Sequence, residues 1–313
     1  MLSRIADSMY WLNRYMERSE GMLRMLHTSY VLSLDKGPTN SNNWKPTLEI
    51  FTGLEGEGID RLEKYPQEAL YLLLFETKNL NSLKMILNKA RENARGMQDH
   101  ITKEVWEQVN HLYHLINSPK TESQIKSADS IAGIESLLKN CLLYTGITDS
   151  TMPRGMSWSF MNLGKYIERC LLTIEFVDKQ YKTIDYDLNQ AKDILYWRGL
   201  LFSLSGYEFH LKNYRNQDIN YNIAHQAIFN AQFPHSIMYS LMRLKKYLDD
   251  VVKENSPAEK YALLKQFGRL YSNVEFADFE WIRRNGLPDY LNETKGNLLS
   301  FSRSLSQSFF SYS

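Results

Sequence analysis

A Glu-Arg dipeptide occurs twice in this chain of 313 residues, each time inside an apolar segment with helical spacing. The first is Glu17-Arg18 and the second is Glu168-Arg169, which lie 151 positions apart (168 − 17), close to half of the chain. In both places a basic, an aromatic and an aliphatic residue precede the pair. Burying an acid and a base is costly unless both charges are paired, so finding such a pair twice in matching contexts indicates that the pairs have a role. We infer a duplicated helical unit whose charged pairs face each other or a common partner.

Apolar residues recur at steps of three and four over residues 5–26 and again over residues 157–182, which predicts two long amphipathic helices. Members of the second stripe each lie 151 positions after a member of the first: Met9, Leu12, Met16, Ser19 and Leu23, then Phe160, Leu163, Ile167, Cys170 and Ile174. No segment alternates apolar and polar residues as a strand would. We predict an all-α fold, a single helical-bundle domain over residues 1–313 with internal pseudo-two-fold duplication and halves at approximately residues 1–145 and 146–313.

Turn-forming residues divide the rest of the chain. The first break is expected at residues 35–43, short and weakly periodic pieces follow over residues 46–66, and residues 146–155 form the clearest interior break. Capping residues and prolines between these breaks predict further helices at approximately residues 67–78, 81–97, 101–117, 122–145, 188–212, 220–230, 235–254, 257–284 and 289–310.

The composition argues against several classes of protein. Lys and Arg total 37 and Asp and Glu total 36, and this balance is not that of a dedicated nucleic-acid binder. The most apolar run, residues 69–75, is too short to span a bilayer, and the first residues carry charge too early for a secretory signal. Cys141 and Cys170 form neither a disulfide framework nor a metal-ligand spacing, which favours a reducing compartment. We expect a cytoplasmic protein that binds neither nucleic acid nor membrane, and the sequence leaves its oligomeric state open.

Six charged residues around the two dipeptides are the first candidate site. Each basic residue that precedes a pair is an i,i+3 neighbour of the glutamate and can pair with it along the helix. Arg18 shares a helix face with Trp11 and Met22, so its guanidinium is expected to cross apolar surface towards another helix. Two roles are open: a buried charge ladder that fixes helix register, or a cleft between the halves in which the arginines grip a carboxylate or phosphate. The candidates are Arg14, Glu17, Arg18, Lys165, Glu168 and Arg169.

The second candidate is an anion-binding loop before the second Glu-Arg helix. Hydroxyl groups, an arginine and the N-terminus of the following helix could together receive an anion. The candidate residues are Thr151, Arg154 and Ser157. Ordinary capping of the helix by Asp149, Ser150 or Ser157 explains the same residues and is the favoured interpretation.

Other catalytic and metal-binding patterns are missing from the sequence. Neither Glu-x-x-His nor His-Glu-x-x-His occurs, and His111 and His114 have no acidic residue in the expected pattern. The glycines of residues 53–58 lack the Lys-Ser/Thr of a phosphate-binding loop, and no Gly-x-Ser-x-Gly nucleophile elbow is present. We therefore expect no cofactor and no metal, and no residue can be assigned a catalytic role.

The opening residues 1–20 resemble, almost residue by residue, the start of the alpha-E domain family, bacterial helical proteins named for a Glu-Arg motif. Residues 151–169 resemble the second signature of that family, and residues 92–113 and 233–236 fit it as well. The resemblance covers essentially the whole chain. It implies a helical domain rather than a particular reaction.

The chain departs from the family pattern at a few of these positions. Asn13 stands where the family usually has Gly, Gly155 and Met156 replace residues that are often acidic, and His235 occupies a position that is usually basic. Family members are commonly encoded beside, or fused to, circularly permuted ATP-grasp proteins, with transglutaminase-like and proteasome-like proteins nearby. The resemblance therefore implies partners of these kinds and a pathway that forms, trims or transfers amide bonds on a peptide.

These observations favour a non-catalytic helical partner or scaffold in an ATP-grasp-linked, amide-bond-forming pathway. The alternative is an enzyme subunit, an amide ligase or transferase, with the Glu-Arg pairs lining a cleft between the two halves. A third hypothesis is a purely structural protein that forms oligomers and whose charged pairs never meet a ligand. Burial separates these hypotheses, because pairs sealed in the core favour the first and third, and pairs that face a cleft favour the second.

Overall fold

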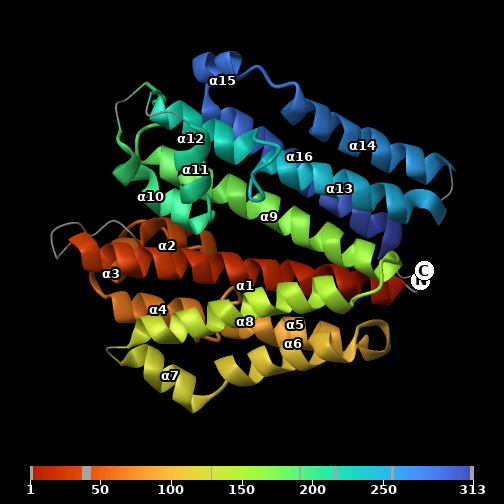
Figure 1. Cartoon of the computed structure of the whole chain (residues 1–313), viewed down its shortest axis with the longest axis horizontal. Coiled ribbons are helices and arrows are strands. Elements are labelled where there is room, and N and C mark those ends of the chain that lie inside the picture. Colours follow the sequence, from red (N-terminus) through yellow and green to blue (C-terminus); the bar gives the residue numbers. More distant parts are fainter. Residues whose placement is uncertain are drawn as a thin grey trace. The chain divides into compact units, whose positions relative to one another are not determined.

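The computed structural model describes residues 3–36, 44–127, 129–189, 192–214, 217–254 and 257–310. The regular structure in these ranges is helical and includes no strand, which confirms the predicted all-α class (Figure 1). The chain divides into two compact units. We call Trp11–Pro153 the N-terminal unit, and Met1–Tyr10 together with Arg154–Ser313 the C-terminal unit. The first helix, α1 (Ser3–Lys36), contributes to both.

The N-terminal unit packs short helices around longer ones. Helix α6 packs against α5 and α8, α7 packs against α8, and α2, α3 and α4 pack against one another. Besides most of α1, this unit contains α2 (Lys45–Thr52), α3 (Glu57–Lys64), α4 (Pro66–Leu74), α5 (Leu83–Arg95), a 3-10 turn (Gln98–His100), α6 (Lys103–Ile116), α7 (Pro119–Lys126) and α8 (Ser130–Thr151).

The C-terminal unit is built on α9. Helix α13 packs along α9, α16 packs against both α9 and α14, and α12 and α10 contact α9 (Figure 1). The helices of this unit after residue 154 are α9 (Met156–Lys182), α10 (Ile194–Ser203), α11 (Tyr207–Asn213), α12 (Ile219–Ile228), α13 (Ile237–Val251), a 3-10 turn (Val252–Glu254), α14 (Pro257–Glu275), α15 (Phe279–Asn285) and α16 (Leu287–Phe309).

Helix α9 is buried around most of its circumference. From Phe160 to Ile174 every residue except Lys165 is buried. A helix that is buried on all sides has no solvated face on which a charge could be carried cheaply. The second Glu-Arg pair therefore lies in a stretch of α9 that is almost entirely buried.

Local sequence explains where many helices begin. Side chains of Ser82, Thr102 and Ser236 accept hydrogen bonds from the backbone N–H groups three residues later, at the starts of α5, α6 and α13. Proline stands in the first turn of α2, α4, α7 and α16, where its missing N–H costs nothing. Because these capping and proline signals are local, the helix starts predicted from them agree with the structure to within a few residues.

The interior break predicted at residues 146–155 is shorter than expected. Helix α8 continues to Thr151, and only residues 152–155 separate it from α9. The predicted helix over residues 122–145 is in fact two helices, α7 and α8. Thr148 and Thr151 donate to the carbonyls of Tyr144 and Ile147 at 2.7 and 2.9 Å, so their hydroxyl groups are satisfied inside the helix rather than in a turn.

Two other predicted helices are each divided. The helix predicted over residues 188–212 becomes α10 and α11, separated at Ser205, whose φ of 55° is left-handed and ends the first of them. The helix predicted over residues 257–284 breaks after Glu275, and the Asp278 carboxylate caps the next helix by accepting from the Glu280 N–H at 3.0 Å. In the predicted break at residues 35–43, positions 37–43 lie outside the described residues.

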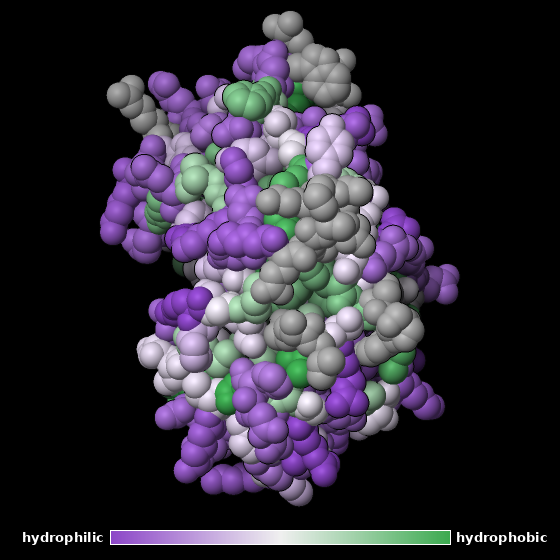
Figure 2. All heavy atoms as spheres, turned by 90° about the vertical axis from the view of Figure 1, so that its right-hand side faces the viewer, coloured by the Kyte–Doolittle hydropathy of each residue, from purple (hydrophilic) through white to green (hydrophobic). Residues whose placement is uncertain are grey.

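On the face drawn in Figure 2, hydrophilic residues cover most of the area and hydrophobic residues show in smaller areas between them. Among the helices that the structure describes, none combines the length and the hydrophobicity needed to cross a bilayer.

Candidate functional site

The second Glu-Arg pair is buried in the C-terminal unit. Glu168 is 1% exposed and Arg169 is 9% exposed, and their neighbours Ile167 and Cys170 are completely buried. An Arg169 Nη1 donates to the carbonyl oxygen of Pro234 at 3.4 Å, a long hydrogen bond to the turn before α13. Both charged groups are therefore held where a solute in the surrounding water has little access.

Arg169 lies beside a group of tyrosine rings. Its Cζ is 5.4 Å from the ring centroid of Tyr166, which stacks on Tyr247 at 6.1 Å and packs against Tyr239 at 6.4 Å. Burial raises the pKa of Tyr166 to about 12, so this phenol is neutral at physiological pH. The Nζ of the half-buried Lys165 is 5.8 Å from the Tyr166 ring centroid.

A second guanidinium completes this group. Arg243 donates from Nη2 to the Tyr239 hydroxyl at 2.8 Å, and this hydrogen bond raises the pKa of Arg243. Sequence reasoning missed Arg243, Tyr239 and Tyr247. The sequence pattern that could have identified them is an aromatic residue and a basic residue four positions apart, Tyr239 and Arg243, on one helix face directly after the turn at residues 233–236.

The first Glu-Arg pair lies in the N-terminal unit and is less enclosed. Glu17 is 6% exposed, whereas Arg18 is half-buried. The Nη1 of Arg18 donates to the side-chain oxygen of Asn81 at 2.9 Å, so the side chain does reach the segment before another helix, α5. The cation over the Trp11 ring is Arg14, with its Cζ 4.7 Å from the ring centroid, and Arg14 itself is buried.

The two arginines reach similar turns. Asn81 directly precedes Ser82, which caps α5, and Pro234 lies two residues before Ser236, which caps α13. Both capping serines are completely buried. In each unit, therefore, the arginine of the pair is bonded to the turn that starts a following helix. This contact could not be read from the helix sequence alone.

The N-terminal unit has an additional charged pair one turn further along α1. Glu20, 5% exposed, accepts two hydrogen bonds from Arg24, at 2.8 and 3.1 Å. Cys141 on α8 lies close to both groups, and burial raises the pKa of its thiol, which keeps it protonated. Glu20 belongs to the same opening segment as the Glu17-Arg18 pair but was not among the predicted candidates.

A glycine and an asparagine occupy positions 151 residues apart (164 − 13) in the two Glu-Arg segments. At Gly164 an added Cβ would collide with the carbonyl oxygen of Tyr10 and lie 2.9 Å from its carbonyl carbon, so α9 and the first turns of α1 touch backbone to backbone. Asn13 is buried, and its side-chain oxygen accepts from the Tyr144 hydroxyl at 2.6 Å. The departure from the family glycine thus adds a hydrogen bond between α1 and α8.

The predicted anion-binding loop is divided between the two units. The hydroxyl of Thr151 lies 2.8 Å from that of Thr102, within the N-terminal unit. Arg154 is exposed, and its Cζ stacks 3.8 Å above the Trp158 ring in the C-terminal unit. Ser157 lies half-buried in the first turn of α9.

The favoured capping interpretation of this loop is wrong. Asp149 and Ser150 lie within α8, and α9 starts after Gly155 without a side-chain cap. The reason is that α8 takes up the polar residues 148–151 as helix, so none of them is free to cap α9. Anion binding there stays a prediction.

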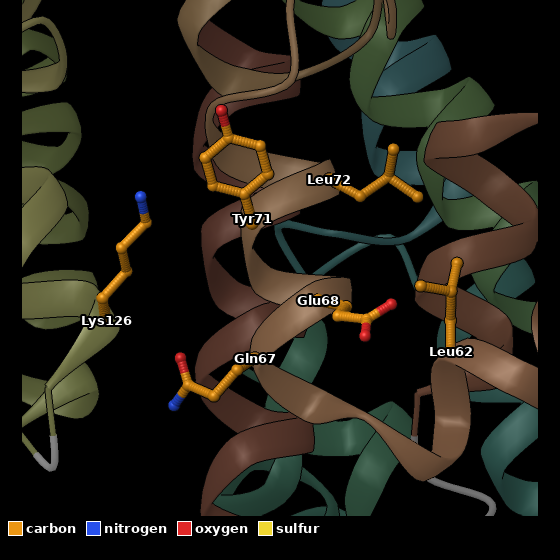
Figure 3. Close-up of a pocket in the computed structure, with 6 residues that line it drawn as sticks. All are labelled: Leu62, Gln67, Glu68, Tyr71, Leu72 and Lys126. Atoms are coloured by element: carbon orange, nitrogen blue, oxygen red, sulfur yellow. The ribbon is translucent and has the colours of Figure 1, made fainter.

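One open pocket lies on the N-terminal unit, with a volume of about 440 Å³ between α3, α4 and α7 (Figure 3). Glu68 is paired with Arg61 at 3.0 Å, and Gln67 donates to Ser130 at 3.2 Å. Lys126 is paired with Glu122 at 2.6 Å and lies 4.9 Å from the ring centroid of Tyr71. Glu68, Gln67 and Lys126 are thus already bonded to residues outside the pocket lining, so the pocket offers a ligand little beyond apolar contact.

The described residues include no group of three or more His, Cys, Asp or Glu side chains placed to hold a metal ion.

Comparison with known proteins identifies the family. Residues 1–310 match the Alpha-E family, which is described as a predicted alpha-helical domain with a conserved ER motif. The chain belongs to the Alpha-E family.

Its curated relatives include uncharacterised proteins of Mycobacterium bovis and Mycobacterium tuberculosis, each 20% identical to it over 307 residues. These alignments cover 93% of this chain and 34% of each relative, so the chain spans about a third of the length of the curated relatives it matches. No solved structure gives a significant match.

Proposed function

We propose that this protein is a non-catalytic helical partner or scaffold in an ATP-grasp-linked pathway that forms amide bonds on a peptide. The observation that carries the proposal is the burial of Glu17, Glu168 and Arg169, which are 6%, 1% and 9% exposed. A general acid, base or anion-binding arginine must reach its substrate, whereas a charge that fixes helix register must be enclosed. Burial on this scale favours the second role.

The pathway rests on the resemblance to the alpha-E family. Its proposed partners are a circularly permuted ATP-grasp protein and a transglutaminase-like protein. The scaffold would present a helical surface to the ligase or hold the peptide that is being modified. The two cysteines are free and buried, which suits the reducing cytoplasm that we propose as its location.

We also propose that the two units descend from one duplicated helical unit. The 151-residue offset of the Glu-Arg pairs supports this, and so does the second correspondence between the units: in both, the arginine binds the turn before a helix capped by a buried serine, Ser82 or Ser236. Separately determined structures of the two units, superposed on α1 and α9, test this. Arginines directed to unrelated turns after superposition would contradict it.

An enzyme subunit is the second candidate, because three of the candidate cationic groups remain reachable. Arg154 is exposed and Arg18 and Lys165 are half-buried, so each could contact an anionic substrate or intermediate bound by a complex. In this alternative the Glu-Arg segments would contribute to a shared site rather than only to the fold. The two candidates predict different behaviour of the isolated chain.

The deciding experiment compares the isolated chain with the reconstituted complex. Alone, the protein is expected neither to bind nor to hydrolyse ATP at physiological concentrations, and amide-bond formation should appear only after a circularly permuted ATP-grasp partner is added. The variant Arg154→Ala should weaken partner binding or turnover without lowering the melting temperature, because the side chain is exposed. The matched control is Arg303→Ala, which removes another exposed arginine, on α16.

The enzyme alternative predicts the opposite result. An isolated chain that turns over ATP or a peptide, and loses that activity in Glu17→Gln or Glu168→Gln while remaining folded, would establish a catalytic role. The failure of any ATP-grasp partner to bind would overturn the scaffold proposal itself.

A further inference from the structure

Helix α8 (Figure 1) carries two stripes of residues at steps of three and four, and the N-terminal unit covers only one of them. The covered stripe is almost completely buried in that unit, where α6 and α7 pack on α8. It consists of Ile134, Leu137, Cys141, Tyr144 and Thr148. The opposite stripe faces solvent, and neither the family motif nor the proposed function assigns it a role.

The exposed stripe has an apolar centre. Leu142 and Leu143 are 40% and 51% exposed, and Gly146 beside them is exposed too. A Cβ added at Gly146 would have nothing within 4 Å, so the helix backbone is open to another chain at this point. One exposed leucine is ordinary, but two neighbouring ones next to an uncovered helix backbone form a surface on which a second helix could pack closely.

The residues along this stripe have a palindromic spacing. Lys139, Leu142, Gly146 and Asp149 follow one another at steps of three, four and three, so the spacing is the same in either chain direction. Such steps are those of the seam between two packed helices. A second copy of α8, antiparallel to the first and centred on position 144, therefore lies with Leu142 opposite Gly146 and Lys139 opposite Asp149.

Both of these pairings are complementary. The Leu142 side chain enters the space that Gly146 leaves, and the ammonium group of Lys139 meets the exposed carboxylate of Asp149. The Lys139 side chain is 77% exposed, and its nitrogen lies 3.8 Å from Glu135, which is a long and weak ion pair, so it can turn towards a second chain. Two-fold symmetry repeats each pairing, which gives two leucine contacts and two ion pairs.

The charges also disfavour the parallel arrangement. Two parallel copies would place Lys139 opposite Lys139 and Asp149 opposite Asp149, and like charges repel. An unrelated partner would need neither the symmetric spacing nor opposite charges at the two ends of the stripe. The pattern therefore selects a second copy of this chain, in one orientation.

We propose that this protein forms a two-fold symmetric homodimer in which α8 packs antiparallel against α8 of a second copy. Leu142, Leu143 and Gly146 form the centre of the interface, and Lys139 and Asp149 form ion pairs at its two ends. The interface uses neither Glu-Arg pair and does not depend on the proposed scaffold role.

Sedimentation equilibrium of the full chain over a range of protein concentrations measures the dimer directly. One helix face is at the small end of protein interfaces, so the expected dissociation constant is roughly 100 μM. The chain should therefore be monomeric at low micromolar concentration and mainly dimeric several-fold above that constant. A monomer throughout this range would overturn the proposal and leave the stripe for a different partner.

Charge reversal tests the register and the orientation. Lys139→Glu and Asp149→Lys each place like charges opposite one another at both ends of the interface, and each alone should weaken self-association about ten-fold. Mixed in equal amounts, the two variants should form a heterodimer about as tightly as the parent forms its homodimer, because every pair is again of opposite charge. The double variant should dimerise as the parent does. No recovery in the mixture would contradict the antiparallel register.

The apolar centre is tested by Leu142→Gln, which should weaken self-association about ten-fold, because the polar side chain no longer fills the space at Gly146 favourably. Lys212→Glu, which reverses the charge of an exposed lysine on α11, is the matched control and should leave the dimer unchanged. Weakening by Lys212→Glu equal to that by Lys139→Glu would mean that the general charge of the protein controls association. Self-association that Leu142→Gln leaves intact would place the interface elsewhere. Circular dichroism of each variant separates loss of association from loss of folding.

Discussion

The two Glu-Arg segments make different kinds of contact at matching positions. On α9 the residue five positions before Arg169 is Gly164, which has no side chain and lets the helix touch the backbone of Tyr10. On α1 the position at the same offset is Asn13, which instead links to Tyr144 through its side chain. The segment on α9 makes a close backbone contact because Gly164 has no side chain, whereas the segment on α1 makes a side-chain hydrogen bond through Asn13.

The residues that directly follow the two Glu-Arg pairs also differ, and those on α1 are the more polar. Position 19 is a serine that donates to the Tyr15 carbonyl at 2.8 Å, whereas position 170 is a buried cysteine. Position 20 is the glutamate paired with Arg24, whereas position 171 is a leucine. At these two positions the segment on α1 therefore carries polar side chains and the segment on α9 carries apolar ones. The same dipeptide therefore has neighbours of different polarity in the two units.

The largest expected difference is in the arginines. Replacing the buried Arg169 with Met should lower the free energy of unfolding by about 3–5 kcal/mol, because the buried Glu168 then loses an adjacent cation. The half-buried Arg18→Met should cost less, about 1.5–3 kcal/mol, through its hydrogen bond to Asn81. Urea denaturation of both variants, with Arg303→Met as control, measures the difference. Melting temperatures within a degree or two of the parent for both would show that neither arginine stabilises the fold.

The next effect concerns the glycine. Gly164→Ala should destabilise by about 1–3 kcal/mol, since the new Cβ meets backbone atoms of Tyr10 that cannot rotate away. Gly146→Ala is a matched control in α8, where nothing lies within 4 Å, and should stabilise by up to about 1 kcal/mol through helix propensity. If both substitutions have the same sign in thermal melts, close backbone contact is not what Gly164 provides.

A smaller effect is expected at the polar contact on α1. Tyr144→Phe leaves the buried oxygen of Asn13 without its donor and should cost about 1–2 kcal/mol. A double-mutant cycle with Asn13→Ala measures the interaction directly, and residues in contact should couple by at least about 0.5 kcal/mol. Additive losses would show that the hydrogen bond contributes nothing to stability.

The smallest effect is a pH dependence of the C-terminal unit. Burial lowers the pKa of both His210 and His225, so at acidic pH the unfolded chain binds more protons than the folded one. Stability from these histidines is complete above the ordinary pKa of about 6.5 and is lost as the pH falls below it. The double variant His210→Asn with His225→Asn should lose less stability than the parent between pH 7.5 and 5.5.

The control for this pH effect is His111→Asn, an exposed histidine of the N-terminal unit, which should keep the pH dependence of the parent. Hydrogen exchange resolved by unit measures where stability is lost. Equal loss in both units on acidification would mean that other groups control the response.

The sequence alone determined the helical class, the two long helices that carry the Glu-Arg pairs, and most helix starts. These depend on local rules: apolar spacing of three and four residues, capping serines and prolines in first turns, all of which act within one or two helical turns. The family followed from residues 1–20 and 151–169 for the same reason, since a motif is a local pattern. Glu17 and Glu168 could be singled out as candidates, because charge within an apolar stripe is visible in the sequence.

Only the tertiary structure decided which contacts those residues make. Residues 148–151 read as a turn yet continue α8, because Thr148 and Thr151 satisfy their hydroxyl groups on the helix itself. The partners Asn81, Pro234 and Tyr144 lie 63, 65 and 131 residues from Arg18, Arg169 and Asn13, and no local pattern specifies such pairs. Burial and long-range pairing depend on how helices pack, and packing is a property of the whole unit rather than of any one segment.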